Sequence, residues 1–192
     1  MTIPRHEQDI TVALGTNLGS LAGGRRATLA AALAALQRAG LRLVAVSRFF
    51  ATPCFPAGSG PDYVNAVAVV RGPDDPLAVL DRLHDIEAAF DRARTQRWGA
   101  RTLDLDLLAM GGRVLPDAQT EAHWRLLPPD QQIGTVPDEL VLPHPRVADR
   151  GFVLVPWADI APDWEHPVTG LTVRQMVMRL PPDQQAEPIA IA

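Results

Sequence analysis

Residues 62–70, Asp-Tyr-Val-Asn-Ala-Val-Ala-Val-Val, form the stretch on which the fold prediction depends. Their alternation predicts a strand, which turns successive side chains to opposite faces. One face begins with two polar residues, whereas the other is apolar throughout. The first face carries Tyr63, Asn65, Val67 and Val69, and the second carries Val64, Ala66, Ala68 and Val70.

Outward from this strand, the chain alternates between strand and helix patterns. Strands are predicted over 10–14, 41–51 and 101–109, and helices over 25–39, 76–90 and 172–180. Gly40 is the expected end of the first helix, Asp75 and Pro76 begin the second, and Thr172 with Gln175 fits a capping box. The side chains expected to face inward are Leu29, Leu33, Leu36, Leu77, Leu80, Leu83 and Ile86.

This order of elements predicts an α+β fold with helices packed on a mostly antiparallel sheet, and a ferredoxin-like βαββαβ core is the natural match. We expect a single domain over residues 9–180, flexible ends at 1–8 and 181–192, and an extended loop or insertion at about 112–138. Residues 141–162 are expected to form a turn and a short helix.

Composition excludes several classes of function. All 18 basic residues of the 192 are Arg, so neither a P-loop nor Schiff-base chemistry, which both need Lys, is available. A net charge of −4 gives no sign of nucleic-acid binding, and the single Cys54 excludes an internal disulfide and a Cys-rich zinc site. Neither a signal peptide nor a membrane span is apparent, so we expect a cytoplasmic protein.

The sharpest chemical signal is Asp104-Leu105-Asp106 in the last predicted strand. Both carboxylates fall on one face of that strand, roughly 7 Å apart along the backbone. Such a pair suits one or two Mg²⁺ ions, which favour one or two carboxylates together with phosphate oxygens and water. An ordinary half-exposed strand is the competing interpretation.

Four arginines precede these carboxylates within ten residues. They indicate either ion pairs on a solvated face or a mobile basic loop that closes over a polyphosphate. Trp98 lies in the same loop and is expected to cover something flat. The four arginines are Arg92, Arg94, Arg97 and Arg101.

Further candidates come from three other segments. Asn65, beside Tyr63, offers the donor and acceptor that the edge of a heterocycle needs, and Phe152 has a ring that can stack. Prolines flank His144, which is either a phosphate ligand or a turn residue, and Arg150 follows on the same segment.

Four segments resemble the signatures of the 6-hydroxymethyl-7,8-dihydropterin pyrophosphokinase family, and they occur in the family's order. They are Ala13–Gly19, Pro61–Val67, Arg92–Leu108 and Leu142–Phe152. The resemblance implies a ferredoxin-like α+β fold with three αβα layers, a monomer, and transfer of the β,γ-diphosphate of ATP to the pterin hydroxymethyl group, with release of AMP.

The resemblance also implies roles for individual residues. Asp104 and Asp106 would bind two Mg²⁺ ions, and Arg92 and Arg101 would assist the transfer. The nucleotide would meet His84, Glu87, Arg94, Arg97, His144 and Arg150. The pterin pocket would contain Thr52, Pro53, Phe55, Tyr63, Asn65, Trp98 and Phe152.

Three features depart from the family's pattern: Ala100 stands where a Pro is usual, His84 where many members have Gln, and residues 112–138 exceed the usual connector. Two alternatives compete. A magnesium transferase such as a nucleotide-sugar enzyme leaves the Arg-Trp loop and the Tyr63/Asn65 pair unexplained. An inactive or regulatory pterin- or nucleotide-binding module would be expected to lack a carboxylate or a loop arginine, and none is lost.

Overall fold

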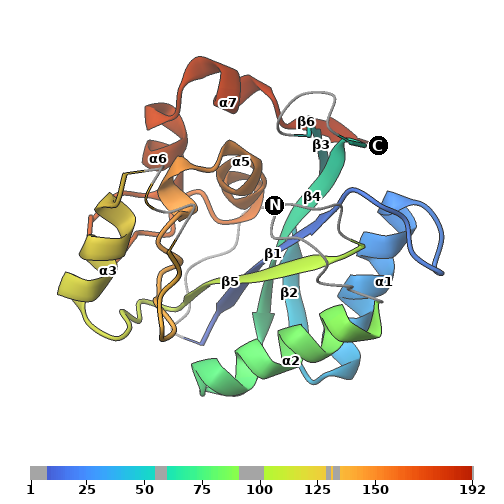
Figure 1. The fold of residues 1–192 in the computed structure, drawn as a ribbon, viewed down its shortest axis with the longest axis horizontal. Helices are drawn as coiled ribbons and strands as arrows, with labels where there is room; N and C mark the ends of the chain where they lie inside the picture. The colour runs from blue at the N-terminus through green and yellow to red at the C-terminus, as the bar shows by residue number, and fades with distance from the viewer. Residues whose placement is uncertain (1–7, 55–59, 91–101, 129–130, 132–134, 192) are drawn as a thin grey trace.

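A computed structural model describes residues 8–54, 60–90, 102–128, 131 and 135–191. Helices and strands alternate through the first two thirds of the chain, and helices dominate the last third (Figure 1). The strands are β1 (Ile10–Thr16), β2 (Arg42–Val46), β3 (Phe49–Thr52), β4 (Tyr63–Arg71), β5 (Asp104–Met110) and β6 (Ile189–Ile191). The helices are α1 (Arg25–Arg38), α2 (Pro76–Ala89), α3 (Ala118–Leu126), the 3₁₀ turn η1 (Val147–Asp149), α5 (Gly151–Ile160), α6 (Val173–Arg179) and α7 (Pro182–Ala186).

The sheet has the topology of the predicted βαββαβ core. Its strands run in the order β5-β1-β4-β3-β6, with β2 also paired to β4, and every neighbouring pair is antiparallel. Each crossover helix returns the chain past one intervening strand, so strands joined through a helix are not neighbours. The expected α+β class and ferredoxin-like core are confirmed.

Two hydrophobic clusters, one on each face of the sheet, make three layers (Figure 1). As predicted, the side chains of β4 divide between them. Val64, Ala66, Ala68 and Val70 pack beneath α1 and α2, whereas Val67 and Val69 pack beneath α5 and α6. We call the second surface the α5 face. No helix in the described part of the chain is long and apolar enough to cross a membrane.

The predicted strand over 41–51 is divided into β2 and β3. Val46 pairs with Ala68 but Phe50 pairs with Asn65, so one extra residue lies between the two strands opposite β4. The Ser47 hydroxyl accepts from the Val67 N–H at 3.0 Å and maintains the link to β4 through the irregular position. The next residue, Arg48, pairs with Asp159 of α5 at 2.8 Å and ties the break to the opposite layer.

Most of the predicted inward side chains do face a core, with one error. Leu29, Leu36, Leu83 and Ile86 are buried, but Leu77 is 59% exposed. Val79 is buried instead. The first turn of α2 follows the Asp75 cap, whose side chain accepts from the Leu77 N–H at 3.0 Å, and this geometry turns position 77 outward.

Two segments expected to be irregular contain regular structure. Asp117 caps α3 inside the predicted 112–138 loop by accepting from the Gln119 and Thr120 N–H groups, both at 2.9 Å. The tail predicted to be flexible over 181–192 forms α7 and β6, and β6 pairs with β3. A Cβ at Gly151 would lie 2.2 Å from the Gln184 carbonyl oxygen, so only glycine lets α7 approach the start of α5 this closely.

A buried polar network attaches α3 to the turn between α5 and α6. Glu121 and His166 are fully buried, and His166 Nε2 lies 3.5 Å from Glu121 Oε1. Arg125 Nε donates to the same Glu121 oxygen at 3.0 Å. Burial raises the pKa of Glu121 although Arg125 lowers it, and burial and then Arg125 lower the pKa of His166 to about 4. His166 is therefore neutral at pH 7.

The network predicts an acid-sensitive component of stability. Unfolded His166 has a pKa of ~6.5. Between that pH and about 4, the unfolded chain binds more protons than the folded chain, so the free energy of unfolding decreases as the pH is lowered. His166 should therefore contribute a loss of about 2 kcal/mol in the free energy of unfolding between ~pH 7 and ~pH 5.

We expect this loss to be removed by His166→Asn, because an Asn oxygen can still accept from the Val168 and Thr169 N–H groups that His166 Nδ1 accepts from. Urea unfolding of both proteins at the two pH values measures the difference. Equal losses in wild type and variant would show that His166 does not titrate in this range.

Candidate functional site

The α5 face has an apolar half and a polar half. Helix α5 covers the half that contains Val67 and Val69 of β4. The other half, which includes Asn65 and the paired residues of β1 and β5, carries polar or small residues. Because β1 lies between β4 and β5, its Gly15 pairs with Asn65 on one side and with Asp104 on the other. One row therefore joins Asp104, Gly15 and Asn65, and the next joins Asp106, Ala13 and Val67.

Gly15 makes room for the side chain of Asn65. A Cβ at position 15 would lie 2.9 Å from Asn65 Oδ1, closer than real contacts allow. The Asn65 amide group donates to the Thr52 hydroxyl at 2.7 Å, and both side chains are nearly buried. Tyr63 pairs with Thr52 in the strand register. The structure thus brings together three of the predicted pterin-pocket residues, Thr52, Tyr63 and Asn65.

The two carboxylates of β5 lie on this polar half. Asp104 and Asp106 are both partly exposed, and the intervening Leu105 is buried on the opposite side. The alternation predicted for the strand is confirmed. Among the described residues, no group of three or more His, Cys, Asp or Glu side chains is arranged to hold a metal. A carboxylate pair is compatible with Mg²⁺, because Mg²⁺ takes few protein ligands and completes its shell with water and phosphate oxygens.

A bulge in β5 brings the 141–150 segment beside the carboxylates. Thr11 pairs with Ala109 but Val12 pairs with Leu107, which leaves Leu108 as the extra residue. The Leu108 carbonyl accepts from the His144 N–H at 2.8 Å. Bulges often occur beside functional sites because they redirect the chain and its side chains. Here the bulge anchors His144 to the strand that carries both aspartates.

His144 is held as a neutral hydrogen-bond donor. Its Nδ1 accepts from the Arg146 N–H at 3.1 Å, which places the proton on Nε2. Burial, followed by the charges of Arg150 and Arg146, lowers the pKa of His144 to about 3. The Nε2–H group is therefore available to an acceptor such as a phosphate oxygen throughout the physiological pH range.

Arg150 links the two parts of the site. Its Nη1 lies 3.6 Å from Asp106 Oδ2, and its guanidinium lies 5.8 Å from the ring centroid of Phe152. The Phe152 side chain, in the first turn of α5, is 42% exposed, which leaves its ring accessible. The structure thus gathers five of the candidate residues in one region: Asp104, Asp106, His144, Arg150 and Phe152.

Three residues apart on α2, His84 and Glu87 were both expected near the nucleotide, but they differ in exposure. His84 is exposed on α2, whereas Glu87 is 2% exposed. Glu87 Oε1 accepts from the Leu105 N–H at 2.9 Å, on the outer edge of β5 between the two aspartates. This bond fixes the strand that carries the carboxylates, and the burial of Glu87 is inconsistent with a side chain freely presented to a nucleotide.

Several predicted site residues lie outside the described part of the chain. They are Phe55, Arg92, Arg94, Arg97, Trp98 and Arg101. Of the remaining predicted pterin-pocket residues, Pro53 is exposed and follows β3 directly.

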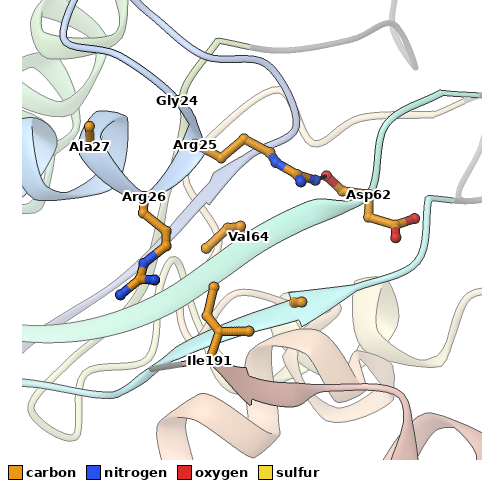
Figure 2. Close-up of a pocket in the computed structure, with 8 residues that line it drawn as sticks. Gly24, Arg25, Arg26, Ala27, Asp62, Val64 and Ile191 are labelled. Carbon is orange, nitrogen blue, oxygen red and sulfur yellow. Dashed lines mark hydrogen bonds between the residues drawn. The ribbon is translucent and has the colours of Figure 1, made fainter.

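A cavity of about 570 Å³ lies elsewhere, between the start of α1 and the strands β3, β4 and β6 (Figure 2). Val64 and Ile191 form its floor, and Arg25 reaches across it to the Asp62 carbonyl (Figure 2). Since Val64 belongs to the face opposite Asn65 and both aspartates, this cavity is separate from the polar half of the α5 face.

Three features of the site were missed from the sequence. Gly15 was given no role, although a glycine directly after a predicted strand can mark a close approach of backbone and side chain. Arg146 lies in the motif that carries His144 but was given no role. The bulge at Leu108 has no signal in the sequence, because it depends on pairing with β1.

Known proteins resemble this chain along most of its length. The model of the family described as 7,8-dihydro-6-hydroxymethylpterin-pyrophosphokinase matches residues 11–162. The chain is 34% identical over 174 residues to the 2-amino-4-hydroxy-6-hydroxymethyldihydropteridine pyrophosphokinase of a Synechocystis species, covering 91% of this chain and 77% of that protein. It is 38% identical to the Pseudomonas aeruginosa protein of the same name, covering 83% of this chain and 85% of that protein.

Solved structures with the same fold include HPPK-DHPS proteins of Plasmodium falciparum. The wild-type protein with STZ-DHP has a TM-score of 0.63 and 14% identity, and the match covers 93% of this chain. A triple mutant with pteroate has a TM-score of 0.62 and 15% identity. This chain spans 44% of each of those longer proteins, and at such identity the likeness concerns the fold alone. The family match over most of the chain and the identity to full-length relatives show that this chain belongs to the 7,8-dihydro-6-hydroxymethylpterin-pyrophosphokinase family.

Proposed function

We propose that this pyrophosphokinase transfers the β,γ-diphosphate of ATP to the hydroxymethyl oxygen of 6-hydroxymethyl-7,8-dihydropterin, with Mg²⁺, in folate biosynthesis. The observation that carries the proposal is the row across three strands that joins Asp104 to Asn65 through Gly15. A pair of carboxylates suited to a metal–phosphate complex and an amide suited to a heterocycle lie on one open half-face. His144 and Arg150 border it with donors for phosphate oxygens.

In the proposed reaction, the pterin hydroxymethyl oxygen attacks the β-phosphorus of ATP. A new O–P bond forms, the bond from the β-phosphorus to the bridging α,β-oxygen breaks, and AMP leaves with the bond electrons. The hydroxyl proton is lost to solvent. Mg²⁺, held by Asp104 and Asp106 when bound, would supply charge neutralisation at the phosphates. Thr52 and Asn65 orient the pterin, and the ring of Phe152 stacks on it.

Around the phosphates, Arg150 and the Nε2–H of His144 stabilise negative charge as it moves toward the leaving oxygen. Glu87 holds the β5 backbone through Leu105 and so fixes the spacing of the carboxylates. The arginines of the 91–101 segment, which lies outside the described residues, belong to the same proposal as additional phosphate contacts.

Release of AMP tests the reaction. Purified protein is incubated with ATP and MgCl₂, with and without 6-hydroxymethyl-7,8-dihydropterin, and nucleotides are separated by chromatography. We expect AMP that depends on both the pterin and the metal. ADP in place of AMP would mean a simple kinase, and the absence of any turnover would favour a binding module.

Asp106→Ala should remove most turnover and leave the fold intact. Loss of one of two metal carboxylates is expected to lower kcat by about 10³-fold, in the range found when an electrostatic stabiliser of a transition state is removed. The side chain is 35% exposed, so its loss opens no buried cavity. Turnover and circular dichroism measure the two expectations.

Asp163→Ala is the matched control for that variant, since this exposed carboxylate pairs with the exposed Arg174 of α6 at 3.2 Å and lies outside the site. It should keep wild-type turnover. Normal turnover in Asp106→Ala would remove Asp106 from the metal site.

Gly15→Ala should selectively weaken pterin binding. The added methyl would displace Asn65 Oδ1 and disturb its bond to Thr52, so we expect the Kd for pterin to rise about tenfold, with a much smaller change for nucleotide. Calorimetric titration with each ligand measures both. Gly24→Ala is the control, because a Cβ there meets no atom within 4 Å. Equal weakening of both ligands would point to a general loss of structure.

We also propose that the protein acts as a monomer in the cytoplasm. The proposal is supported by the family resemblance. Light scattering of the purified protein tests the monomer, and a concentration-independent mass of twice the 20.8 kDa chain would contradict it.

A further inference from the structure

Arg146 has a guanidinium without a partner beside the proposed phosphate site. Its Nε is buried and has no hydrogen-bond partner among the residues that the structure describes. Within the described part of the chain, no ion pair or hydrogen bond of this guanidinium is formed; the residue's contacts run through its backbone N–H, which donates to His144 Nδ1. A guanidinium carries five donors and is never deprotonated in proteins. Burial of the unpaired Nε is unfavourable, whereas the two terminal nitrogens are not among the buried unpaired atoms and are open to a ligand.

The charges around Arg146 do not compensate for it. Burial and the nearby charge of Arg150 lower the pKa of Arg146, and Asp149 acts in the opposite sense. Arg150 itself faces Asp106 at 3.6 Å. Two like charges on one short segment, one of them half-buried and unpaired, need a negative group between or beside them to be stable together.

The remaining donor at this position comes from His144. With its Nδ1 occupied by the Arg146 N–H, His144 presents only its Nε2–H. The hydrogen bond from the Arg146 N–H to His144 Nδ1 therefore holds together the two residues whose side chains offer donors here, His144 and Arg146. A planar guanidinium and a single imidazole N–H group together match the oxygens of a phosphate group, and they cannot serve a cation or an apolar ligand.

We propose that Arg146 is a further binding residue, which acts with His144 and Arg150 to hold the terminal part of a polyphosphate, the part that ATP and the pterin diphosphate carry and AMP lacks. The proposal rests on the proposed function for the identity of the polyphosphate. It extends that function by assigning Arg146, through the terminal nitrogens of its guanidinium, to the diphosphate that is transferred. Arg150, between Asp106 and this segment, places the anion next to the metal carboxylates.

The test measures binding without turnover. Wild type and Arg146→Met are titrated by calorimetry with inorganic tripolyphosphate, with an ATP analogue that has a methylene bridge between the α- and β-phosphorus, and with AMP. Met keeps an unbranched stem and removes every donor. We expect the Kd for tripolyphosphate and for the analogue to rise at least about tenfold, and the Kd for AMP to stay unchanged.

Arg146→Lys and Arg174→Met complete the set. Lys restores the charge but not the Nε donor or the planar fork, so it should recover only part of the lost affinity. Arg174 is 63% exposed on α6 and is paired with Asp163. The Arg174→Met variant should therefore bind all three ligands with wild-type affinity. Thermal unfolding adds an independent measurement. Without ligand, Arg146→Met should have a melting temperature equal to or above that of wild type. On addition of tripolyphosphate, its melting temperature should rise by less than that of wild type.

Two results would overturn the inference. One is wild-type affinity of Arg146→Met for tripolyphosphate. The other is a lower melting temperature of the ligand-free variant with an unchanged gain on adding tripolyphosphate, which would make Arg146 a structural residue. If Arg146→Met is too unstable to purify, the Kd of Arg146→Lys for tripolyphosphate is compared with that of wild type in its place, and an unchanged Kd would overturn the inference. Because binding is measured directly, tripolyphosphate binding that depends on Arg146 would uphold the inference even if pterin-dependent AMP release failed.

Discussion

The position of β1 between β4 and β5 is the constraint on which the site depends. Antiparallel pairing on both sides fixes which residues of three distant segments stand in one row, because a shift of one residue would turn every side chain to the other face. Gly15 is the centre of the row that joins Asp104 to Asn65. Its missing side chain allows Asn65 to lie over the sheet and reach Thr52. A metal-binding and a heterocycle-binding element thereby share one surface.

Charge is distributed so that the site is incomplete without a ligand. On one side are Asp104 and Asp106, and on the other are Arg146 and Arg150, and Arg150 Nη1 lies 3.6 Å from Asp106 Oδ2. Cations would be attracted to the first pair and anions to the second, and a metal-bound polyphosphate is a ligand that meets both needs at once. Neutral His144 lies between them as a donor whose state does not change with physiological pH.

The second layer of helices supports this arrangement from behind. Helix α5 begins directly after Arg150, covers the apolar half of its face, and is tied to the β2–β3 break through Arg48 and Asp159. Helix α7 approaches Gly151 at the start of α5, and the Glu121–His166 network attaches α3 to the following turn. The segments added beyond the βαββαβ core thus position the residues that precede and begin α5.

The sequence by itself determined the strand and helix order of the βαββαβ core, both faces of β4, the alternation around Asp104 and Asp106, and the capping of α2 and α6, because these follow from local periodicity and local hydrogen bonds. It also carried the motifs that indicate the family. Only the tertiary structure decided the break after Val46, the bulge at Leu108, the burial of Glu87 against β5, and the isolation of the Arg146 guanidinium. Each of these depends on pairing or packing between segments far apart in the chain, and spacing along one strand or helix carries no information about it.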